Sequence, residues 1–269
     1  MIRKPIIAGL AIVIIAAAAQ AHDLFLKLDS YFLRPNSKAT VKVLNGTFKE
    51  SDGAVARDRV VNLSLLGPSL SPSSGDSVVW RAEEKMSVME FQTAAPGTYV
   101  IGISTKTREN TRTGAEFNKF LEEDGMPDVL EARRKNNELE KGATQRYSKY
   151  VRAIFQVGDT LSDDYKKSLN HPIELVPQKN PYSLKTGNTI PVLCLLNGRP
   201  LSNQFLTAGW EPKDGKLNSV SVRTDEKGIA HFKLVAPGKW FVKTINMEKV
   251  TVPGLDYESK WATLTFEIK

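Results

Sequence analysis

Short segments in which apolar and polar residues alternate are the feature that most constrains this fold. The segment that ends the chain, WATLTFEIK, places four apolar residues on one side: Ala262, Leu264, Phe266 and Ile268. Three further segments alternate in the same way: VNLSLLG (61–67), TYVIGIST (98–105) and WFVKTIN (240–246). Because successive side chains of a strand point to opposite faces, these segments predict half-buried β-strands. With Gly, Pro and Asn between them, they predict a mostly β chain built as a sandwich or barrel.

Two pairs of similar segments indicate that the chain contains two related halves. YFLRPNSKATVKVLNG begins at Tyr31 and YSLKTGNTIPVLCLLNG begins at Tyr182, and both lead through a turn and an apolar strand to Asn-Gly. Further along, APGTYVIGI begins at Ala95 and APGKWFVKT begins at Ala236. Because the two signatures keep their order, we predict two tandem Ig-like β-sandwich domains.

The segment between the halves has a different, highly charged composition. Phe117, Phe120 and Leu121 fall at helical spacing, and a break at 125–127 (Gly-Met-Pro) separates two predicted helices. The charge run is typical of a solvated helix face, with a partner-binding helix as the alternative. The sequence therefore predicts this division of the chain: a signal peptide at 1–21, an N-terminal β-sandwich at 22–110, a helical insert at 111–150, a return strand and linker at 151–170, and a C-terminal Ig-like β-sandwich at 171–269.

The N-terminus has the pattern of a secretory signal peptide. Arg3 and Lys4 precede an apolar run over 6–19, and a small-x-small site ends at Ala21. The run is shorter than the roughly 20 residues of a membrane span. We expect cleavage after Ala21 and export to a bacterial periplasm; an uncleaved N-terminal anchor is the alternative. A single cysteine, Cys194, excludes an internal disulfide and is expected to fill the core.

Charge and motifs exclude several function classes. The formal net charge is +7, but basic residues are scattered and form no stripe interleaved with aromatic residues, so nucleic acid is not an expected partner. The sequence contains no Gly-x-Ser-x-Gly elbow, phosphate-binding loop, His-Glu-x-x-His or paired-cysteine metal motif. A non-catalytic protein is therefore expected.

The chain has three histidines, and His22 is the first candidate metal ligand. Cleavage after Ala21 would give His22 a free α-amine beside its imidazole, and these two nitrogens can chelate one ion. Nitrogen donors suit Ni²⁺ and Co²⁺, with Cu²⁺ and Zn²⁺ as alternatives. Asp23 could add an oxygen ligand. The competing interpretation is that His22 is an ordinary terminal residue.

The other two histidines are candidates to complete such a site. His171 precedes Pro172 and is expected to be extended, either as a hydrogen-bonded histidine between domains or as a ligand. His231 lies between Ala230 and Phe232, which take the inward phase of a strand, so it is expected to point outward. The candidate metal ligands are thus His22, His171, His231 and Asp23.

Four segments together resemble a bacterial periplasmic domain-of-unknown-function family, family 4198, which is often described as a nickel- or cobalt-uptake periplasmic component. They are AHDLFLKLDSYFLRPNSKATVKV, NHPIELVPQKNPYSLKTGNTIPVLCLLNGRPL, TDEKGIAHFKLVAPGKWFVKTINM and DYESKWATLTFEI. The resemblance implies tandem β-sandwiches, a periplasmic location, and a metal-uptake permease or outer-membrane receptor as partner. Similar proteins often have His-Met where this chain has Asn246-Met247, so any ligand there is altered.

Three functions are consistent with these features. The first is a periplasmic protein that binds Ni²⁺ or Co²⁺ for uptake. The second is a metal-free Ig-like module that binds a protein or glycan through exposed aromatic residues such as Trp80, Trp210 or Tyr257, with Trp240 and Trp261 expected in the cores. The third is a copper oxidase in which His22 and a second histidine form a brace.

Overall fold

The chain is mostly β, with two short α-helices, in a computed structural model that describes residues 22–70, 72–211 and 217–269. The predicted signal peptide at 1–21 lies outside these residues. Among the helices that the structure describes, none is long and apolar enough to cross a membrane. The prediction of a mostly β protein is confirmed.

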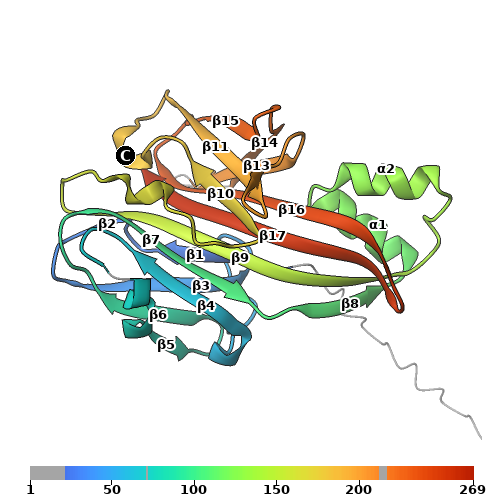
Figure 1. Cartoon of the computed structure of the whole chain (residues 1–269), viewed down its shortest axis with the longest axis horizontal. Helices are drawn as coiled ribbons and strands as arrows, with labels where there is room; N and C mark the ends of the chain where they lie inside the picture. The colour runs from blue at the N-terminus through green and yellow to red at the C-terminus, as the bar shows by residue number, and fades with distance from the viewer. Residues whose placement is uncertain (1–21, 71, 212–216) are drawn as a thin grey trace, which may run out of the picture.

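A nine-stranded sheet, here called the central sheet, runs through the molecule (Figure 1). Its path consists of β14 (Asn218–Arg223), β13 (Phe205–Glu211), β16 (Gly238–Val252), β17 (Leu255–Ile268), β9 (Ala143–Val157), β7 (Gly97–Thr105) and β4 (Val60–Leu66). Two short strands, β2 (Phe32–Leu33) and β8 (Arg108–Arg112), also pair with β9. The parallel pairing of β17 with β9 makes one continuous sheet from strands of both halves of the chain.

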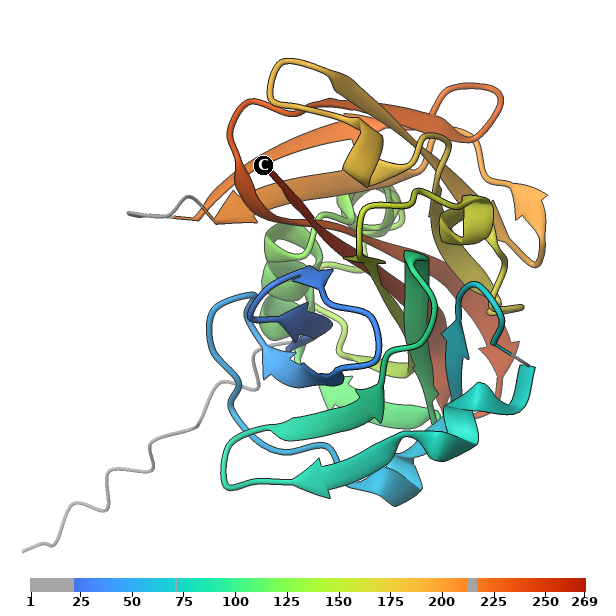
Figure 2. The ribbon, with the colours of Figure 1, turned by 90° about the vertical axis from the view of Figure 1, so that its left-hand side faces the viewer.

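Two four-stranded sheets cover opposite faces of the central sheet, below and above the long strands in Figure 1 and again in the end view of Figure 2. The first contains β1 (Asp23–Leu28), β3 (Lys38–Gly46), β6 (Ser87–Gln92) and β5 (Val79–Ala82). The second contains β10 (Ile173–Pro177), β11 (Thr189–Leu196), β12 (Arg199–Pro200) and β15 (Ile229–Lys233). The first core lies between the central sheet and the first four-stranded sheet, and the second core lies between the central sheet and the second four-stranded sheet. Successive residues of β9 point into different cores: Ala153 and Phe155 into the first and Ile154 into the second.

The repeated signatures have matching local structure. The Tyr99 hydroxyl donates a hydrogen bond to the Ala95 carbonyl oxygen at 2.6 Å, and the Trp240 indole N–H donates to the Ala236 carbonyl oxygen at 3.1 Å. Each aromatic ring thus closes the Ala-Pro-Gly turn before its strand. The two halves nevertheless share the central sheet, so their description as tandem Ig-like domains stays a prediction.

The predicted helices are present as α1 (Gly114–Glu123) and α2 (Pro127–Lys135). A capping box between Thr113 and Glu116 begins α1. The helices cover the C-terminal part of β16 and the N-terminal part of β17. There Phe117 packs with Tyr257, and Phe120 packs with Trp261. The strand β9 begins at Ala143 and so takes in the last part of the predicted insert at 111–150. Four 3-10 turns complete the described elements: η1 (Arg57–Arg59), η2 (Pro72–Ser77), η3 (Asp163–Lys166) and η4 (Pro181–Ser183).

The aromatic residues proposed as an exposed contact surface do not form one. Tyr257 is buried, and Trp210 is half-buried and stacks on Trp240 with ring centroids 4.8 Å apart. Trp80 is half-buried and its indole N–H donates to the Val55 carbonyl oxygen. The prediction is wrong for Tyr257, which is buried, while Trp80 and Trp210 are half-buried against apolar neighbours. The predicted burial of Trp240 and Trp261 is confirmed.

Candidate functional site

Charged and polar side chains gather where β1 begins. The imidazole Nδ1 of His22 lies 3.0 Å from Oδ2 of Asp52, and the two side chains are 38% and 55% exposed. Gly46 makes this approach possible, because a Cβ there would lie 2.6 Å from Asp52 Oδ2. On the inner side, the carbonyl oxygen of His22 accepts a hydrogen bond from the Lys149 ammonium group. The backbone of His22 is therefore anchored while its imidazole faces solvent beside a carboxylate.

Asp23 points into a half-buried ion-pair cluster rather than toward the imidazole of His22. Its Oδ2 lies 2.6 Å from Lys243 Nζ, and Asp124 Oδ1 lies 3.3 Å from the same nitrogen. Burial, aided by the charge of Asp23, raises the pKa of Asp124 to about 6. Asp23 thus balances the charge of Lys243 and is not a free oxygen ligand.

Next to His22 lies a cavity of about 140 Å³ whose wall carries four basic side chains: Arg59, Arg108, Arg112 and Lys149. We call it the cationic pocket. Lys149 is 6% exposed, and burial lowers its pKa to about 8. The pocket therefore holds concentrated positive charge in a chain whose sequence shows only scattered basic residues.

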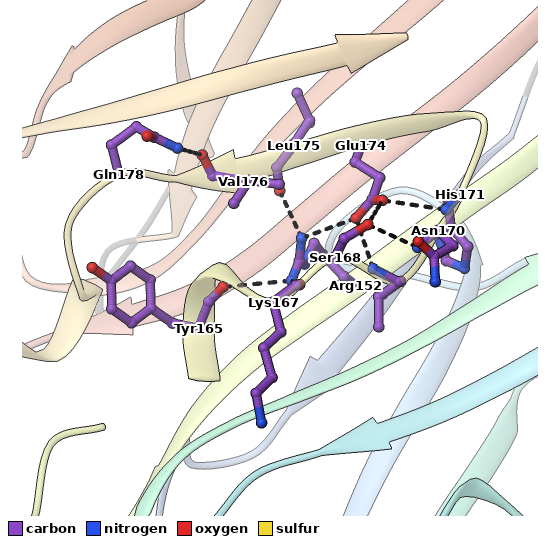
Figure 3. Close-up of polar contacts among 11 residues, drawn as sticks. Arg152, Tyr165, Lys167, Ser168, Asn170, His171, Glu174, Leu175, Val176 and Gln178 are labelled. Carbon is purple, nitrogen blue, oxygen red and sulfur yellow. Dashed lines mark hydrogen bonds and ion pairs between the residues drawn. The ribbon is translucent and has the colours of Figure 1, made fainter. Parts of the chain in front are cut away.

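His171 lies in a separate buried network around Arg152 and Glu174 (Figure 3). The Glu174 carboxylate accepts the backbone N–H groups of Leu169 and His171 at 3.0 and 3.2 Å and pairs with Arg152 at 3.4 Å. Burial lowers the pKa of His171 to about 4, and its Nε2 has no hydrogen-bond partner. Its ring packs on that of Tyr150. The His-Pro-x-Glu sequence thus organises a loop against the central sheet.

His231 lies on β15, exposed, with Ala230 and Phe232 buried on either side, as the alternation predicted. It pairs with Pro191 of β11 in the second four-stranded sheet. Among residues 22–70, 72–211 and 217–269, no group of three His, Cys, Asp or Glu side chains could hold a metal ion. Of the four candidate ligands, only His22 and its neighbour Asp23 lie together, and Asp23 is paired elsewhere.

Sequence reasoning missed Asp52 and the cationic pocket. Asp52 lies in a polar loop after the Asn-Gly that ends β3, and its carboxylate meets His22 through the pairing of β1 with β3. The pocket combines η1, β8 and β9, which only the folded chain brings together. The one usable signal was the alternation of Arg108 and Arg112 with smaller polar residues, which puts both on one face of a strand.

These features define a layered β-sheet protein with a charged site at the start of its first strand. A family model described as "Domain of unknown function (DUF4198)" matches residues 19–248, and the chain belongs to this family. The comparison with curated proteins found no match.

Solved structures that match the chain include the following two. The D0-D1 domain of intimin is 14% identical with a TM-score of 0.21, over 91% of this chain and 97% of that one. A two-domain fibronectin type III segment of chicken tenascin is 12% identical with a TM-score of 0.22, over 91% and 99%. Scores this low carry no argument about fold or function.

Proposed function

We propose that this protein is a non-catalytic periplasmic binding protein that holds a transition metal of the nickel and cobalt class for uptake, with His22 as its main ligand. The observation that carries the proposal is the solvent-facing pair of His22 and Asp52. The family resemblance to nickel- and cobalt-uptake components also supports it. A permease or an outer-membrane receptor would receive or supply the metal.

The donor set suits such an ion. Cleavage after Ala21 would add the α-amine of His22 to its imidazole and to the Asp52 carboxylate, giving two nitrogens and one oxygen. Two donors bound at right angles, each roughly 2.1 Å from a metal, are about 3 Å apart. The 3.0 Å separation of Nδ1 and Oδ2 fits this requirement. With so few protein donors the site would be open, which suits handing a metal on more than holding it permanently.

Calorimetry with Ni²⁺ and Co²⁺ tests the proposal on exported protein whose first residue is confirmed as His22 by mass spectrometry. A variant with one extra alanine before His22 separates the amine from the imidazole chelate. Asp52→Asn removes the oxygen donor, and His231→Asn is the matched control because that imidazole is exposed on a distant sheet. We expect binding that the added alanine abolishes, that D52N weakens and that H231N leaves unchanged. Equal, weak binding by all four proteins would refute the metal function.

A groove of about 910 Å³ favours a second candidate, the metal-free binding of a protein or glycan. It lies between the first sheet and the end of the central sheet, and its walls combine the half-buried ring of Phe32 with charged residues such as Lys27, Glu211 and Glu267. Binding of the wild-type protein and of the Phe32→Ala variant to a glycan array distinguishes the two functions. Binding that F32A abolishes while metal binding is absent would favour this candidate.

A further inference from the structure

The cationic pocket is built from two strands that turn the same face toward it. β8 pairs with β9 so that Arg108 lies opposite Tyr147 and Asn110 lies opposite Gln145. Arg108 and Asn110 alternate with outward residues on β8, and Gln145 and Tyr147 do so on β9, so all four line the cavity. Further along β9 the same face carries Ala153 of the first core. The pocket is therefore the polar continuation of that core.

No acidic side chain of the described residues forms part of the pocket wall, and the nearest carboxylates act on its cations only from outside the cavity. Lys149 donates to two neutral oxygens, the His22 carbonyl and Asn45 Oδ1, and the nearby carboxylates of Asp23 and Asp124 lie on Lys243. Arg112 is 8% exposed, and its hydrogen bond in the pocket goes to the neutral Gln145 Oε1.

Arg59 has a buried hydrogen-bond donor, its Nε, for which the described residues supply no acceptor. Burial, with the charge of Arg108, lowers the pKa of its guanidinium. Desolvated cations without a counter-charge are unfavourable, and a bound anion would offset their repulsion. The pocket thus has the charge of an anion-binding site. Neutral protein oxygens accept from Lys149 and Arg112, and Arg59 Nε is left without an acceptor in the described part of the chain.

We propose that the cationic pocket binds a small oxyanion, of the carboxylate, sulfate or phosphate class, held by Arg59, Arg108 and Lys149. Guanidinium groups donate paired hydrogen bonds to such anions. The volume limits the ligand, because about 140 Å³ is well below the roughly 300–1,000 Å³ of sites for drug-sized molecules. The inference is independent of the proposed metal, since it uses none of the metal's donor atoms.

Calorimetry with a chelator present tests the pocket in the absence of metal. The probes are inorganic phosphate, sulfate and malonate, at constant ionic strength set by chloride. Arg59→Gln and Arg108→Gln each remove one donor group, and both side chains are at least partly exposed, so the fold should tolerate the change. Arg199→Gln is the matched control, because it removes the same charge from an exposed strand far from the pocket.

We expect at least one probe to bind the wild-type protein, with at least a ten-fold weaker affinity in R59Q and R108Q and an unchanged affinity in R199Q. Preference for phosphate and sulfate would assign a tetrahedral ligand, and preference for malonate would assign a carboxylate. The proposal is overturned if no probe binds at millimolar concentration, or if R199Q weakens binding as much as the pocket variants. Loss of metal binding alone would leave it intact.

Discussion

Replacing Glu174 by alanine should strongly destabilise the protein, because this carboxylate is the counter-charge of a buried arginine. The side chains of Glu174 and Arg152 are 4% and 3% exposed. Glu174 also accepts hydrogen bonds from the backbone N–H of Leu169 and from the Ser168 hydroxyl (Figure 3). The substitution would leave a desolvated guanidinium and several donors without their acceptor.

The size of this effect follows from the burial. Breaking a buried ion pair by removing one partner costs about 3–5 kcal/mol. For a chain of this size, one kcal/mol corresponds to roughly 2–4 °C in Tm, so E174A should lower the Tm by roughly 6–20 °C. Burial already lowers the pKa of Arg152 to about 10, but the guanidinium stays charged at neutral pH.

Thermal and urea denaturation followed by circular dichroism measure this loss. The double variant Arg152→Met with Glu174→Leu removes both charges and should recover part of the stability that E174A loses. Recovery should be incomplete, because backbone donors such as the Leu169 N–H still lack an acceptor. Asp163→Ala, which breaks an exposed ion pair with Lys166, is the control and should shift the Tm by no more than roughly 2 °C. A Tm loss below about 3 °C in E174A would refute the reasoning.

Three further predictions concern buried titratable groups. Because burial lowers the pKa of His171 to about 4, the unfolded imidazole is protonated first as the pH falls, so the free energy of unfolding should drop by roughly 3 kcal/mol between about pH 6.5 and 4. His171→Phe should abolish this drop in denaturant titrations, and an unchanged drop would contradict the prediction. Because burial raises the pKa of Asp124 to about 6, its contribution to stability should fall as the pH rises from about 4 to 6. Asp124→Asn should flatten that pH dependence in denaturant titrations, and an unchanged pH dependence would contradict the prediction. The Cys194 thiol is buried and its pKa is raised to about 12, so a thiol reagent at pH 8 should label it in urea only, and rapid labelling of the folded protein would show an open core.

Local patterns predicted the elements of this fold well, because strand alternation and helix caps depend on neighbouring residues. The segment 261–268 belongs to β17, and the Phe117 and Phe120 spacing is that of α1. The predicted half-burial of that segment is wrong, because sheets pack on both faces and Thr263 and Thr265 are buried as well. The parallel pairing of β17 with β9 joins residues more than 100 positions apart, and no local pattern encodes it. That pairing is why one sheet serves both halves.

In the candidate site, too, local sequence patterns identified some residues, and others depend on long-range strand pairing. The sequence singled out His22 from its position after a cleavage pattern, but its neighbour Asp52 depends on the register between β1 and β3. His171 could equally have been a ligand or a structural residue until the Arg152–Glu174 pair was visible. The sequence shows which residues are charged, but whether a charged side chain is buried, and how burial shifts its pKa, depends on the fold.

The cationic pocket and His22 are neighbours, so an ion in one should act on an ion in the other. A divalent cation held by His22 and Asp52 would be repelled by Arg59 and Arg108, and an oxyanion in the pocket would offset that repulsion. Opposite unit charges a few ångströms apart attract by about 1 kcal/mol even in water, which corresponds to a roughly five-fold change in affinity. Saturating sulfate, with ionic strength held constant by chloride, should therefore lower the Kd for Ni²⁺ at least several-fold, and Ni²⁺ should lower the Kd for sulfate by the same factor. The double variant R59Q/R108Q should bind Ni²⁺ more tightly without sulfate and lose the coupling. Equal Ni²⁺ affinity with and without sulfate in the wild-type protein would show that the two sites do not communicate.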